Sequence, residues 1–103
     1  MAQVTAGKHR GCVVSGRVMN AVGQGTVKSL TVRPERGAMI GDVVYPPHEA
    51  TVVVDAQGNW SAELVPSGIV GAYLVRIDRQ RFRMVVPQEA TASFGAIAEL
   101  LPE

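Results

Sequence analysis

Apolar and polar residues alternate along most of this chain, in short runs that end at glycine, proline or asparagine. The cleanest run is residues 60–65, in which Trp60, Ala62 and Leu64 share one face and Ser61 and Glu63 the other. A period of two is the pattern of a strand with one buried face. The same pattern predicts seven strands, at residues 11–19, 26–33, 50–54, 60–65, 72–78, 81–86 and 90–94.

The segments between these strands carry turn signals. Pro34 is expected to end the second strand, and residues 55–59 form a tight turn in which Gly58 supplies a positive φ. Residues 35–48 are the longest irregular stretch. The only helix-compatible segment is residues 96–101, about a turn and a half before Pro102.

The aliphatic composition supports strands. The chain of 103 residues has seventeen valines against five leucines and four isoleucines, and β-branched side chains suit a pleated surface. Its length fits one domain. We therefore predict an all-β fold, a single Ig-like or prealbumin-like β-sandwich of about seven strands with a short C-terminal helical turn. Residues 1–10 are expected to form an N-terminal arm, and residues 11–103 the sandwich domain.

Charge and hydropathy exclude several partners. Ten Lys and Arg against nine Asp and Glu give a net charge of +1, so no overall bias favours nucleic acid or a membrane. The longest aliphatic run, Val52–Val54, is too short to span a bilayer, and the N-terminus lacks a signal peptide. We expect a protein made in the cytoplasm and not exported by a cleaved signal.

Residues with catalytic or metal-binding chemistry are few and scattered. His9 and His48 are the only histidines and have no ligands at metal-site spacing. The single cysteine, Cys12, allows no internal disulfide and lies in an apolar strand, where a buried cysteine acts as a small hydrophobe. No serine has a nucleophile-elbow context. We expect no enzymatic activity, no metal and no cofactor.

The late hairpin holds the one local excess of charge, with only Asp78 to offset it. Guanidinium groups that project together can bind a carboxylate-rich partner or an anionic sugar. The alternative is a solvated edge hairpin whose charges prevent aggregation. The candidate residues are Arg76, Arg79, Arg81 and Arg83.

A second candidate surface lies in the irregular stretch, where apolar residues are interrupted by a glycine. The segment forms either a short extra strand or a docking loop, because exposed apolar patches often mark interfaces. Its residues are Met39, Ile40, Val43, Val44 and Tyr45. Trp60 offers two interpretations as well: its alternation with Ala62 and Leu64 favours the core, whereas stacking on a sugar needs an outward face.

Four segments resemble a known module: VVSGRVMNAVGQG (residues 13–25), VVVDAQGNWSAELVP (52–66), YLVRIDRQRFRMVVP (73–87) and ATASFGAIAELLP (90–102). Their order is similar to a β-sandwich module of tailed bacteriophages, found in minor tail and fibre proteins and as a free-standing small virion protein. Its layout is similar to prealbumin-like and carboxypeptidase-regulatory-like sandwiches. The chain departs from the usual pattern of the phage module at two places. Thr26-Val27 stands where a proline is common, and Asp78-Arg79-Gln80 where a glycine pair is common.

The resemblance implies a non-enzymatic structural protein of the virion. A capsid decoration or cement protein is favoured, because the module stands alone. It would bind the major capsid protein or other virion subunits, with a homo-oligomer, preferably a trimer, at the lattice seams. Two alternatives stay open: a tail adaptor or fibre-associated module, and a carbohydrate-binding module with a host-surface glycan as its ligand.

Overall fold

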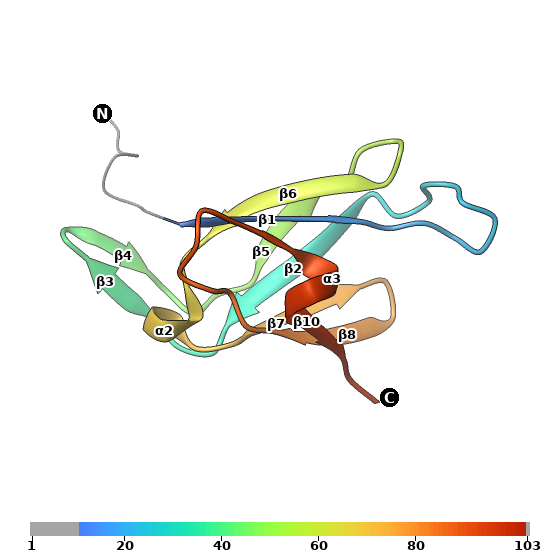
Figure 1. Cartoon of the computed structure of the whole chain (residues 1–103). Helices are drawn as coiled ribbons and strands as arrows, with labels where there is room; N and C mark the ends of the chain where they lie inside the picture. Colours follow the sequence, from blue (N-terminus) through green and yellow to red (C-terminus); the bar gives the residue numbers. More distant parts are fainter. Residues whose placement is uncertain (1–10, 103) are drawn as a thin grey trace.

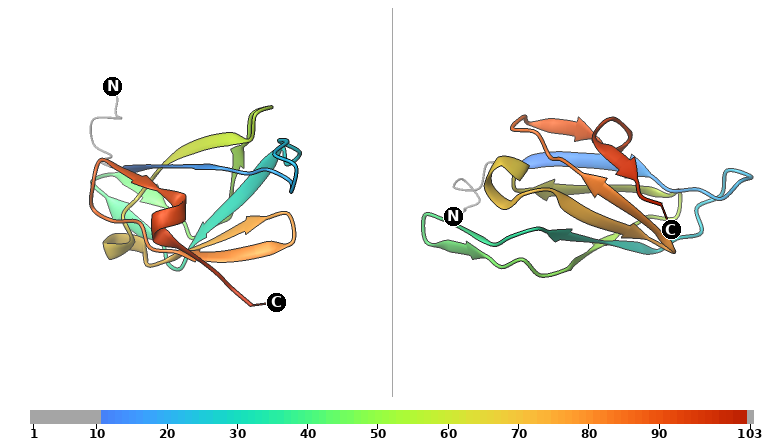
Figure 2. Two further views of the ribbon diagram at one scale, coloured as in Figure 1. Left: turned by 45° about the vertical axis from the view of Figure 1, so that its right-hand side comes forward. Right: turned by 90° about the horizontal axis from the view of Figure 1, so that it is seen from below.

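The computed structural model describes residues 11–102, and short strands dominate it (Figure 1). A three-stranded sheet has the order β6-β1-β9, and a five-stranded sheet has the order β10-β8-β7-β2-β5. Figure 2 shows the two sheets as facing layers. The strands of the smaller sheet are β1 (Cys12–Arg17), β6 (Asn59–Leu64) and β9 (Thr91–Ser93). Those of the larger sheet are β2 (Ser29–Pro34), β5 (Ala50–Val53), β7 (Tyr73–Ile77), β8 (Gln80–Met84) and β10 (Ala98–Leu100).

Three small elements complete the fold. Strands β3 (Ala38–Ile40) and β4 (Val43–Tyr45) form a separate antiparallel hairpin, which extends away from the two sheets (Figure 1). Gly41 opens its two-residue loop with φ +64°, a conformation that glycine adopts without steric cost. Two four-residue helices, α2 (Ser67–Val70) and α3 (Phe94–Ile97), lie in the connections.

The core lies between the two sheets and follows the predicted alternation. Cys12 and Val14 of β1 are fully buried, and Tyr73, Val75 and Ile77 of β7 are all less than a tenth exposed. Burial of these side chains, mostly aliphatic, is the main force that holds the layers together. The other buried hydrophobic residues of the core cluster are Leu30, Val32, Val54, Trp60, Val65, Val70, Met84 and Val86.

Trp60 belongs to this core, with 4% of its surface exposed. It pairs across the strands with Gly16, and a Cβ on Gly16 would lie 2.8 Å from the indole ring. The ring of Phe94 packs edge-on against Trp60, with 5.3 Å between the ring centroids, and against Phe82 of the other sheet, with 5.2 Å between the centroids. The inward prediction for Trp60 is therefore confirmed, and the indole is a structural residue that links the layers.

The all-β, sandwich-like prediction is confirmed, and each of the seven predicted strands has a counterpart. The predicted short C-terminal helical turn is present as α3, but it spans Phe94–Ile97 and not residues 96–101. β10 follows it at once, pairing Ala98 with Met84 and Leu100 with Phe82. A helix of one and a half turns gains few hydrogen bonds, whereas the edge of β8 offers a ladder of them. The arm predicted at residues 1–10 lies outside the described residues.

Strand boundaries differ from the prediction by up to three residues, and the largest difference is at the start of β2. β2 begins at Ser29 and not at Thr26, and Pro34 is its last residue, paired with Tyr73. The turn at residues 55–59 is confirmed, since Gly58 has φ +86° and the Asp55 carboxylate accepts hydrogen bonds from the N–H groups of Gln57 and Asn59, both at 2.9 Å.

Candidate functional site

Four arginines lie on the outer face of the five-stranded sheet. In β7 the inward residues are apolar, so the alternation turns Leu74 and Arg76 outward. In β8 the same rule turns Arg81 and Arg83 outward, and all these arginines are exposed. In β2 Leu30 and Val32 are buried, which places Arg33 on the same face. We call Arg33, Arg76, Arg81 and Arg83, with Leu74 between them, the arginine face.

The strand register arranges these residues in two rows across the sheet. In one row Arg76 pairs directly with Arg81 on one side and with Thr31 on the other. In the next row Leu74 pairs with Arg83 on one side and with Arg33 on the other. Glu99 of β10 continues this row, because it pairs with Arg83 from the far side. Neighbouring strands are about 4.8 Å apart, so the backbones of Arg33 and Arg83 are separated by about 10 Å.

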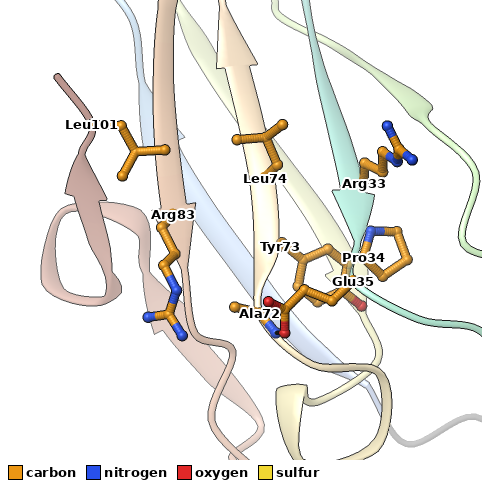
Figure 3. A pocket seen from close by; sticks show the side chains of 8 residues that line it. All are labelled: Arg33, Pro34, Glu35, Ala72, Tyr73, Leu74, Arg83 and Leu101. Carbon is orange, nitrogen blue, oxygen red and sulfur yellow. Dashed lines mark hydrogen bonds between the residues drawn. The ribbon is translucent and has the colours of Figure 1, made fainter. Parts of the chain in front are cut away.

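A shallow hollow lies over the second row, with a volume of about 300 Å³. In Figure 3 Arg33 and Arg83 stand on opposite sides of Leu74, which lies between them. At the end of the hollow the carboxylate of Glu35 accepts a hydrogen bond from the backbone N–H of Ala72 at 3.0 Å. The lining residues are Arg33, Pro34, Glu35, Ala72, Tyr73, Leu74, Arg83 and Leu101.

The guanidinium groups of this face are largely free. Arg81 donates a hydrogen bond to the carbonyl oxygen of Pro102 at 3.0 Å. Within residues 11–102, the guanidinium groups of Arg33, Arg76 and Arg83 make no hydrogen bond or ion pair. Like charges directly opposite each other in a sheet destabilise it, so the Arg76–Arg81 pair costs the fold free energy.

The interpretation of the late hairpin as a guarded sheet edge is wrong. β10 covers the outer side of β8, and β7 lies between β8 and β2. The arginines therefore point out from the middle of a sheet face and shield no free backbone edge. Arg79 is separate from them, because it lies in the tight turn after Asp78, which has φ +56°.

Arg33 was missed by the sequence reasoning, which looked for charge that is dense along the chain. It is distant from the late hairpin in sequence and joins the site only because β2 pairs with β7. The local signal was present in the alternation of Leu30 and Val32, which already turned Arg33 outward.

The apolar segment forms the β3–β4 hairpin, and its two faces differ. Met39 and Val44 are paired across the strands and are 69% and 64% exposed. Ile40 and Tyr45 lie on the opposite face and pack, partly buried, against the core. The structure thus separates the five candidate residues into a supporting face and an exposed one, with Val43 beside the loop at 40% exposed.

The positions of Cys12 and of the described His, Asp and Glu residues favour neither a reactive nor a metal-binding role. Cys12 is fully buried, and this burial raises the pKa of its thiol, with a further increase from the nearby Glu89 carboxylate. A raised pKa keeps the thiol protonated and unreactive. In the part of the chain that the structure describes, no group of three or more His, Cys, Asp or Glu is placed to hold a metal ion. No helix within residues 11–102 has the length and apolar character needed to cross a membrane.

Comparison with known proteins adds no relative: no protein-family model matches the chain, and no curated protein does.

Proposed function

We propose that this chain is a non-enzymatic structural protein of a tailed-phage virion, a capsid decoration protein that binds the assembled coat lattice. The proposal starts from the resemblance of residues 13–102 to the phage sandwich module. The observation that carries it furthest is the β3–β4 hairpin, which extends from the sandwich and exposes Met39 and Val44. Exposed apolar side chains on a projecting element are typical of a protein–protein contact.

In this proposal the sandwich is a rigid block and the hairpin is its contact with the coat. The inner face of the hairpin packs through Ile40 and Tyr45 against the core, so Met39 and Val44 are held in a fixed orientation. At a seam between two coat subunits, the hairpin could contact both subunits at once. A protein that binds only the assembled lattice stabilises the assembled state by mass action.

The test is the copy number of this protein relative to the major coat subunit in purified particles of the phage that encodes it, measured by quantitative mass spectrometry. Decoration predicts about one copy per coat subunit, or a simple fraction of that number, as lattice symmetry requires. A ratio lower by orders of magnitude would place the protein at the tail or at one vertex and overturn the decoration role. Absence from particles would overturn the virion assignment altogether.

A further inference from the structure

The arginine face combines two features that the proposed function does not use. It gathers four positive side chains from three strands, and it places an apolar hollow between two of them. Folding explains neither feature, because the Arg76–Arg81 pair is repulsive and no hydrogen bond or ion pair within residues 11–102 holds the guanidinium groups of Arg33 and Arg83. Two carboxylates lie near, Glu99 opposite Arg83 in the sheet and Glu35 at the hollow, but the four arginines outnumber them. Unpaired charges held close together on a rigid sheet are suited to an external anionic group.

The chemistry of the face selects among anionic partners. The outward side chains of the described strands of this sheet are polar, charged or aliphatic, and none is aromatic. Single-stranded nucleic acid and sugar rings are commonly held by stacking on aromatic side chains, which this face does not provide. Protein interfaces combine arginine with apolar contacts near their centre. Leu74, flanked by Arg33 and Arg83, has that arrangement.

We infer that the arginine face binds an acidic segment of a partner protein, with carboxylates at Arg33 and Arg83 and an apolar side chain in the hollow over Leu74. Each guanidinium can bind a carboxylate through two parallel N–H···O hydrogen bonds. In an extended peptide the side chains of residues i, i+2 and i+4 point to the same face, and residues i and i+4 are about 13 Å apart. Two long arginine side chains that rise from backbones about 10 Å apart can reach carboxylates at that separation. The side chain of residue i+2 then faces Leu74, midway between the two carboxylates.

This inference goes beyond the proposed function. It concerns strands β2, β7 and β8 and not the β3–β4 hairpin. The copy number in particles, which tests the proposed function, therefore does not test this inference.

The experiment uses a fluorescein-labelled peptide with two glutamates four positions apart and a leucine midway between them. Its binding to the purified full chain is followed by fluorescence anisotropy at low salt. Controls are the same peptide with glutamines for glutamates, the same peptide with serine for leucine, and a labelled oligo-dT strand. We expect the first peptide to bind most tightly, since it alone satisfies both arginines and the hollow.

Variants then locate the site. Arg33→Gln and Arg83→Gln are each expected to weaken binding at least about tenfold, because each removes one charge-assisted pair. Arg33→Lys and Arg83→Lys are expected to recover only part of the loss, since an ammonium group does not form the bidentate contact. Arg17→Gln is the matched control, because Arg17 is an exposed arginine on β1 of the other sheet and its loss changes the net charge equally.

Far-UV circular dichroism confirms that each variant is folded. Three results would overturn the inference: no binding of the acidic peptide, equal loss of affinity in Arg17→Gln, or tighter binding of oligo-dT. Failure of the acidic peptide to bind would show that an acidic segment is not the ligand. An equal loss of affinity in Arg17→Gln would show that the peptide responds to net charge alone. Tighter binding of oligo-dT would indicate that the face is a nucleic-acid site.

Discussion

At the scale of single residues, the position of the Trp60 indole requires that residue 16 has no side chain. The indole of Trp60 lies against the backbone of Gly16, and the ring of Phe94 packs edge-on against it. The Nε1 atom of Trp60 is buried with no hydrogen-bond partner in the described part of the chain. The ring is therefore fixed by packing, and it has little room to move.

We expect Gly16→Ala to lower the free energy of unfolding by about 1–3 kcal/mol, the usual cost of excess volume in a packed core. The new Cβ would lie 2.8 Å from the indole of Trp60, which is buried in the core and packed edge-on by Phe94. Urea unfolding followed by tryptophan fluorescence measures the change. Gly68→Ala is the control, because no atom beyond its chain neighbours and the backbone of its own helix lies within 4 Å of its Cβ position. This variant should unfold at the same urea concentration as the natural chain, or slightly higher. Equal stability of Gly16→Ala and the natural chain would contradict the packing argument.

Tyr73 gives a second residue-scale prediction, in which stability depends on pH. Its hydroxyl donates a hydrogen bond to the carbonyl oxygen of Val65 at 2.7 Å. Burial raises the pKa of Tyr73 to about 12, and the hydrogen bond that the phenol donates to Val65 also favours the protonated form. The folded state therefore holds the phenol proton more tightly than the unfolded state, whose tyrosine pKa is about 10.

The contribution of Tyr73 to stability is fully present below about pH 10 and is lost as the pH rises toward about 12. We expect the stability difference between the natural chain and Tyr73→Phe to be constant up to about pH 10 and then to fall by as much as about 2–3 kcal/mol. Phenylalanine has no proton to lose, so the other titrating groups cancel in the difference. Urea unfolding at several pH values between about 9 and about 12 measures this. A difference that stays constant over that range would show that Tyr73 ionises as readily in the folded state.

At the scale of elements, we expect one face of the β3–β4 hairpin to contribute to stability and the other face to binding. Met39→Thr together with Val44→Thr should change the free energy of unfolding by less than about 0.5 kcal/mol, because both side chains are mostly exposed. Ile40→Ala, on the face that packs against the core, should cost about 1–2 kcal/mol. Thermal unfolding of the variants measures both effects.

The same hairpin variants test the proposed function. The Met39 and Val44 double variant should remain folded yet fail to bind purified coat lattice in a co-sedimentation assay. If it sediments with the lattice as well as the natural chain does, the contact lies elsewhere on the molecule.

Elements also show where local pattern was sufficient and where it was not. Strand β6 was predicted within one residue at each end, because its alternation is a local property of the backbone. β10 was missed, because alanine and leucine at residues 98–101 suit a helix equally well. Only the free edge of β8, supplied by a distant part of the chain, selects the strand.

At the scale of the whole molecule, the two sheets are bound into one unit. β1 pairs with β6 and also, in parallel, with β9, so strands from near both ends of the described chain lie side by side in one sheet. The last strand, β10, lies in the other sheet. Phe94 contacts Trp60 of one sheet and Phe82 of the other. Neither sheet has a core of its own, since the buried residues of both contribute to one cluster.

We therefore expect a single cooperative unfolding transition. Trp60 fluorescence reports the three-stranded sheet, and far-UV circular dichroism reports all strands, so the two urea curves should coincide. An earlier fluorescence transition would show that the smaller sheet detaches before the larger one unfolds.

The sequence by itself determined the all-β class, the inward faces of the main strands, the burial of Cys12 and Trp60, and the turn at residues 55–59. Each of these depends on the spacing of neighbouring side chains or on one turn residue, and both are written locally in the chain. It also located three of the four residues of the arginine face, because a tight hairpin joins them.

Only the tertiary structure decided which strands are neighbours. The pairing of β2 with β7 brought Arg33 beside the hairpin arginines, and β10 removed the late hairpin from the sheet edge. Many sheet orders satisfy the same alternation, because every strand offers the same backbone donors and acceptors. The choice among them is made by packing and hydrogen bonds between residues far apart in sequence, and the arginine face with its apolar hollow exists only as a result of that choice.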